Sequence, residues 1–188
     1  MNQTTSPQKH IVGQLIEALK TERMLQTDFF QDASLQAWFG THQRSSTPSP
    51  LKQGVQREQL VFEAGRLSLA RQLTGKGFSF SLEGPDYRGL TGLRAEDLVE
   101  ALGEPHKKVD FVVAQLTPPP RYPEPGPRGL LISPQPVRKR GETTHPLGNH
   151  DLFWEWTTDT STSKFSADIN GDGSVEAVNG RQDRRPGL

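Results

Sequence analysis

The spacing best suited to chemistry lies near the end of the chain, where oxygen-bearing side chains alternate. The five are Asp168, Asn170, Asp172, Ser174 and Glu176. Oxygen ligands at alternate positions with a glycine at the bend, here Gly173, are typical of a calcium loop. The twelfth position of that loop should carry a bidentate carboxylate, and here it is Asn179. Asn-Gly and Asp-Gly pairs also favour tight turns, so we predict a β-hairpin first and a weak calcium site second.

The other candidates for chemistry do not form a known motif. The histidines are His10, His42, His106, His145 and His150, and no two of them are four residues apart as in a metalloprotease helix. There is no Gly-x-Ser-x-Gly sequence, and Gly75-Lys76-Gly77 is too short for a phosphate-binding loop. We therefore predict no enzyme and no required cofactor. An unrecognised hydrolase stays as an alternative, because catalytic partners meet in space and not in sequence.

Charge and composition argue against several classes of partner. The 22 basic residues are balanced by 22 acidic ones, so the basic excess that a nucleic-acid binder uses against phosphates is missing. No segment approaches the roughly 20 apolar residues of a membrane span, and residues 1–20 lack the apolar core of a signal peptide. The absence of cysteine fits a reducing compartment. We expect a soluble, cytoplasmic protein without membrane insertion.

The N-terminal part of the chain indicates helices. Ser6 and Pro7 can begin a helix that carries apolar residues at helical spacing to Leu19, and a second, aromatic helix is predicted over 27–39. We assign 1–40 to an N-terminal helical segment and 41–55, rich in Ser and Pro, to a linker. Residues 56–73 favour a helix, with a hairpin turning near Gly65 as the alternative.

The rest of the chain indicates a small sheet with one long insertion. Strands are predicted over 78–82, 109–116, 151–157, 165–169 and 175–177, and a short helix over 94–102. Nine prolines lie between 117 and 150, so we predict a mobile insertion there, whose residues 120–125 could form a polyproline segment for a partner. The α+β domain is assigned to 56–179 and a flexible tail to 180–188. The fold class is α+β, with N-terminal helices packed on a small antiparallel sheet.

Residues 90–179, without the insertion, resemble a known family. The motifs are Gly92-Leu93, then Leu102-Gly103-Glu104-Pro105, a strand with Trp154 and Trp156, and a strand–turn–strand ending near Val178. This order is similar to the SmpA/OmlA-type modules of outer-membrane assembly lipoproteins and to β-lactamase-inhibitor-like folds. The resemblance implies a short helix on a three-stranded antiparallel sheet, in a class of modules that bind other proteins and catalyse nothing.

The chain departs from those lipoproteins in lacking a signal peptide and a lipidated cysteine, and in carrying the 117–150 insertion. Their membrane role is therefore not expected here. We expect a non-enzymatic protein-binding module such as a bacterial immunity protein, inhibitor or adaptor, whose partner is another protein. A calcium-binding structural module is the alternative from a different class, beside the hydrolase.

Overall fold

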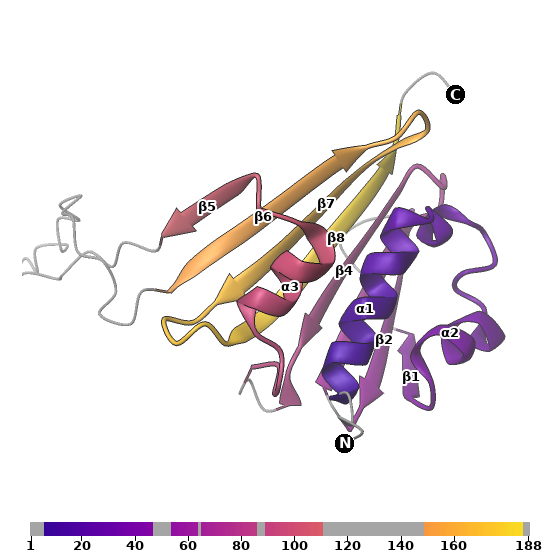
Figure 1. Cartoon of the computed structure of the whole chain (residues 1–188). Helices are drawn as coiled ribbons and strands as arrows, with labels where there is room; N and C mark the ends of the chain where they lie inside the picture. Colours follow the sequence, from indigo (N-terminus) through magenta and orange to yellow (C-terminus); the bar gives the residue numbers. More distant parts are fainter. Residues whose placement is uncertain (1–5, 47–53, 64, 86–88, 111–148, 186–188) are drawn as a thin grey trace, which may run out of the picture.

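The computed structural model describes residues 6–46, 54–63, 65–85, 89–110 and 149–185. They form one antiparallel sheet of eight strands with helices packed against it (Figure 1). The fold is α+β, as predicted, and the sheet is larger than expected. Apart from residues 149 and 150, the Pro-rich insertion predicted at 117–150 lies outside the described residues, and so do the predictions of its mobility and of a polyproline segment. In the described part, no helix is long and apolar enough to cross a membrane.

Four helical elements occur among the described residues: α1 (Pro7–Lys20), the 3-10 helix η1 (Arg23–Leu25), α2 (Asp32–Phe39) and α3 (Ala95–Leu102). α1 begins at Pro7, where the missing N–H costs no helical hydrogen bond. Ser6 does not cap this helix. Its hydroxyl donates instead to the carbonyl oxygen of Thr91 at 2.8 Å, which ties the start of α1 to the segment before α3.

The strands pair in the order β1-β2-β3-β4-β8-β7-β6-β5, and all neighbours are antiparallel. Their bounds are β1 (Gln43–Ser46), β2 (Val55–Phe62), β3 (Gly65–Gln72), β4 (Gly77–Glu83), β5 (Lys107–Asp110), β6 (His150–Thr157), β7 (Ser161–Ile169) and β8 (Val175–Arg184).

The described elements repeat one plan twice. A helical part is followed by four strands, β1–β4, and then α3 is followed by four more, β5–β8. The last strands of the two halves, β4 and β8, pair at the centre of the sheet, so the strand order reads the same from either edge. Figure 1 shows α1, α2 and α3 on the same side of the sheet. This arrangement gives the sheet one covered face and one face without a described helix.

The hydrophobic core lies between the helices and the covered face. Leu15 and Leu19 of α1 are fully buried there, together with Leu98 of α3 and with Leu67 and Leu82 of the sheet. Trp154 is 2% exposed and so belongs to this core, and its ring N–H donates to the carbonyl oxygen of Gly103 at 2.8 Å. Trp156 is only partly buried against the same core.

Residues 56–73 form the β2–β3 hairpin and not a helix. Arg66 and Ser68 are exposed, whereas the intervening Leu67 and Leu69 are buried, which is the period of a strand. Gly65 has a φ of +148°, and a Cβ there would lie 2.3 Å from the carbonyl oxygen of Glu83. The glycine that weakens a helix is therefore required where β3 passes close to the end of β4.

Other boundaries differ from those predicted. The segment 41–55, expected as a linker, contains β1 and the first residue of β2. The predicted helix over 27–39 begins only at Asp32, after a series of turns. β8 continues to Arg184, so residues 180–184 belong to the sheet and not to a tail. Polar composition suggested loops at 41–55 and 180–184 because the side chains of an edge strand and of an uncovered face are polar too.

Candidate functional site

The second face of the sheet is not covered by the described helices; we call it the open face. It is built from every second residue of β2, β3, β4, β8, β7 and β6, alternating with the core residues. A central row crosses these strands in register: Gln59, Ser68, Ser81, Asn179, Ser166 and Phe153. No residue of this row is charged, and three of the six are serines with short side chains.

Charged rows of opposite sign flank the central row. On one side the basic row contains Arg57, Ala70, Ser79, Arg181, Lys164 and Glu155. On the other side the acidic row contains Val61, Arg66, Glu83, Ala177, Asp168 and Asp151. The side chains of Lys164 and Arg181 are 60% and 61% exposed, and they pair with Glu155 and Asp183 respectively. The open face is therefore an ordered polar surface with a charge gradient along its strands.

Two carboxyl groups of the acidic row face each other and have raised pKa values. Asp151 and Asp168 lie directly opposite each other on β6 and β7, and their side chains are hydrogen-bonded. Burial raises the pKa of Asp168, and the neighbouring Asp151 raises it further both as a charge and as the hydrogen-bond acceptor. Burial also raises the pKa of Asp151, while the bond from Asp168 and the charge of His150 oppose the rise. For Asp168 all three causes act in the same direction, so its carboxyl group binds a proton more readily than an ordinary aspartate does.

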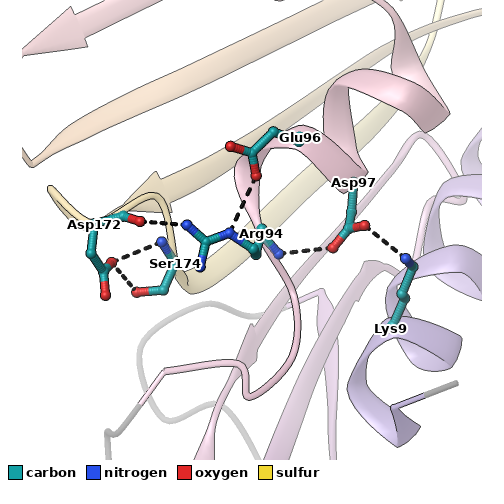
Figure 2. Close-up of polar contacts among 6 residues, drawn as sticks. All are labelled: Lys9, Arg94, Glu96, Asp97, Asp172 and Ser174. Carbon is teal, nitrogen blue, oxygen red and sulfur yellow. Dashed lines mark hydrogen bonds and ion pairs between the residues drawn. The ribbon is translucent and has the colours of Figure 1, made fainter. Parts of the chain in front are cut away.

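A second polar cluster joins α1, α3 and the β7–β8 turn (Figure 2). Lys9 pairs with the carboxylate of Asp97 at 2.7 Å, and Asp97 also accepts from the backbone N–H of Arg94 at 3.0 Å, at the start of α3. The guanidinium of Arg94 donates to the carbonyl oxygen of Asp172 at 2.6 Å and pairs with Glu96 at 3.3 Å. The hydrogen bond from Lys9 holds the pKa of Asp97 below its ordinary value.

A cavity of about 410 Å³ opens beside this cluster and is lined by Lys9, Leu93, Arg94, Asp97 and Ser174, among others. The Ser174 hydroxyl donates to the carboxylate of Asp172 at 2.6 Å, and this bond lowers the pKa of Asp172. A carboxylate with a lowered pKa is a weak base, so it does not activate the hydroxyl. The charged groups here pair with each other and join the two halves of the chain. Their role is therefore structural.

Another cluster of hydroxyl groups surrounds the carboxylate of Glu22, after the end of α1. Thr160 and Ser161 donate to one of its oxygens at 2.7 and 2.9 Å, and Thr158 donates to the same oxygen. These bonds, led by that from Thr158, lower the pKa of Glu22. The cluster holds the end of α1 on the β6–β7 turn and does not resemble a nucleophile with its base.

The predicted calcium ligands do not all point the same way. β7 and β8 form the expected hairpin, and Gly173 in its turn has the expected positive φ of +82°. Within the turn, Asn170 and Asp172 both bond to Ser174. Asp168 instead meets Asp151 on the open face, and Glu176 is the exposed extra residue of a bulge. The structure shows the hairpin, and the calcium site stays a prediction.

The histidines that the structure describes lie apart from one another in the fold. His10 is exposed on α1, the ring of His42 lies tilted against that of Phe62, and His106 accepts from the backbone N–H of Glu155 at 3.3 Å. His150 lies at the start of β6, and His145 lies outside the described residues. Within the described ranges, no group of three or more His, Cys, Asp or Glu side chains could hold a metal ion.

Sequence reasoning missed most of the open face. The alternation of Phe78 to Leu82 already placed Ser79 and Ser81 on one side of a strand, but nothing in the sequence paired them with Asn179 and Ser166. Because a helix was expected over 56–73, the residues that β2 and β3 supply to the open face were not foreseen either. The available signal was the serine content at alternate strand positions, which is typical of a solvated sheet face.

Comparison with known proteins gives no relative for this chain: no family model, no curated protein sequence and no solved structure matches it.

Proposed function

We propose that this chain is a non-enzymatic protein-binding module of the immunity, inhibitor or adaptor type, and that the open face is its binding surface. The observation that carries the proposal is the row pattern across six paired strands, with uncharged residues between a basic and an acidic row. Short side chains in the centre allow close approach of a partner surface. The charges on either side fix its orientation and exclude wrong partners.

The surroundings of the face support the same function. The backbone of a hydrogen-bonded sheet changes little on binding, so a partner meets a preformed surface. The two clusters that combine hydroxyl and carboxylate groups, around Ser174 and around Glu22, are paired internally and offer no activated nucleophile. The resemblance of residues 90–179 to SmpA/OmlA-like modules points to protein binding as well.

Affinity capture from the cell that encodes the chain tests this proposal. The bait is the full chain, compared with a Ser81→Arg/Ser166→Arg double variant that places two long side chains in the central row. Gln36→Arg, at an exposed position of α2, is the matched control. We expect one captured protein to be lost from the double variant and kept by the control, with all three baits showing the same circular dichroism. Retention of that protein by the double variant would place the binding surface elsewhere.

A further inference from the structure

A row of polar side chains crosses the covered face of the sheet near the end of α1. Trp156 of β6, Ser163 of β7 and Gln182 of β8 lie in register on three neighbouring strands. Gln182 is fully buried and Ser163 is 1% exposed, while Trp156 packs against the hydrophobic core. Polar groups inside a core destabilise the fold unless each has a hydrogen-bond partner. The partners of this row therefore have to be identified atom by atom.

Only part of the row is paired within the described residues. The Nε2 of Gln182 donates to the carbonyl oxygen of Leu19 at 2.7 Å and to the Ser163 hydroxyl at 2.8 Å. Because a carbonyl oxygen only accepts, the first bond fixes the orientation of the amide. The Oε1 of Gln182 and the Nε1 of Trp156 are both buried and have no partner in the described part of the chain. The first is an acceptor and the second a donor, so the row calls for a group that both donates and accepts.

We infer that a buried water molecule binds over Ser163, where it accepts from the indole N–H of Trp156 and donates to the Oε1 of Gln182. Serine is the shortest of the three side chains and lies between the two long ones. The backbones of β6 and β8 are about 10 Å apart at about 4.8 Å per strand, a span that two long side chains and one water can bridge.

The hydroxyl of Ser163 supplies a third partner for the same water. It accepts from Gln182, so its own proton is free to donate. Buried waters typically make about three hydrogen bonds to polar groups that are otherwise unsatisfied. The row therefore offers a water molecule two donors and one acceptor, which is a complete set of partners.

The bound water belongs to the junction between the two halves of the chain. Leu19 lies in α1 of the first half, and Gln182 and Trp156 lie in β8 and β6 of the second. With the water in place, one chain of hydrogen bonds runs from the Leu19 carbonyl group to the indole of Trp156. The site lies on the covered face, so the inference is independent of the function proposed for the open face.

Nuclear magnetic resonance of the full chain tests the inference, with two indole N–H protons as reporters. We expect water cross-peaks at the Nε1–H of Trp156 with opposite signs in NOE and ROE spectra, because a buried water tumbles with the protein. Trp154 supplies the matched control, since its Nε1 donates to the carbonyl oxygen of Gly103 and should show no such cross-peak. Cross-peaks of equal sign at Trp156 report proton exchange with solvent, and missing ones report no long-lived water. Either result overturns the inference.

Two variants separate a bound water from magnetisation relayed through the Ser163 hydroxyl, whose proton exchanges with solvent. Ser163→Ala removes the relay and keeps the donor of Trp156 and the acceptor of Gln182, so the cross-peaks should persist. Gln182→Leu removes the acceptor, so the cross-peaks at Trp156 should disappear while the Nε1–H of Trp154 keeps its chemical shift. Loss in Ser163→Ala, or persistence in Gln182→Leu, contradicts the bridging water. Circular dichroism shows whether each variant is folded, and the wild type and Ser163→Ala decide the inference if Gln182→Leu does not fold.

Discussion

At the scale of single residues, the described part of the molecule contains an interaction that works against its own stability. Asp151 and Asp168 are directly opposite on neighbouring strands, where like charges are unfavourable. Elsewhere in the described part, charged groups such as Lys9, Asp97 and Arg23 lie in ion pairs. Two facing acids on the open face are what a binding role for that face predicts, because function and stability often conflict at such sites.

Replacing Asp168 with Asn should stabilise the protein at neutral pH. The amide keeps a hydrogen bond to Asp151 and removes the repulsion, so we expect a gain of about 0.2–1 kcal/mol, or about 1–4 °C in melting temperature. The pKa of Asp168 is higher in the folded state than in the unfolded one, so the folded state binds more protons between the two values. The stability of the wild type therefore falls as pH rises through that window.

The gain in stability from Asp168→Asn should accordingly be largest above the raised pKa of Asp168. It should disappear as pH falls towards about 4, the ordinary pKa of aspartate. Melting temperatures of both proteins, measured across this pH range, show whether the gain grows as pH rises. Glu176→Gln, at an exposed residue of the β7–β8 bulge, is the control for removal of one negative charge. A gain for Asp168→Asn that is independent of pH, or that Glu176→Gln reproduces, contradicts the raised pKa of Asp168.

At the scale of elements, the strands could be foreseen best where one side faces the core and the other faces solvent. The alternation in 78–82 and 165–169 identified β4 and β7, and the Asn-Gly-Asp-Gly turn identified the β7–β8 hairpin. The β2–β3 hairpin was only the alternative prediction because 56–73 is rich in helix formers, and tertiary pairing overrode that propensity. The end of β8 was missed because the residues from Gly180 onward are polar, as they are in a flexible tail, when their neighbours in space are unknown.

Gly180 is in fact required by the packing of β8 on β4. A Cβ at this position would lie 2.2 Å from the ring of Phe80, which packs across the glycine on the covered face. Gly180→Ala should therefore destabilise the protein by about 1–3 kcal/mol, as overpacking of a core does. Denaturant unfolding measures this loss.

Gly13 supplies the matched control for that substitution. It lies in α1, and a Cβ there meets nothing within 4 Å. Gly13→Ala should stabilise the protein by about 0.5–1 kcal/mol, since glycine is a poor helix former. We therefore expect the two glycine-to-alanine substitutions to change the free energy of unfolding in opposite directions. A neutral Gly180→Ala would mean that the Phe80 ring does not lie over β8.

At the scale of the whole molecule, two halves of the same plan meet at the β4–β8 pair and place the described helices on one side. The sequence shows no repeat of fixed period, so this arrangement could not be foreseen from it. The open face follows directly from the plan, because both described helical parts cover one side of the sheet and leave the other without a described helix. The candidate site is therefore a property of the topology and not of any local motif.

Chemical labelling tests the central claim, that the open face is the surface by which this chain binds a protein. The chain has no cysteine, so Ser166→Cys on the open face and Gln36→Cys on α2 each introduce a single thiol. Maleimide reaction rates are compared with and without the captured protein. We predict that binding slows the reaction of Ser166→Cys by about tenfold or more, because an interface core excludes solvent, and leaves Gln36→Cys unchanged. Undiminished reactivity of Ser166→Cys in the complex, with protection of Gln36→Cys, would contradict the claim.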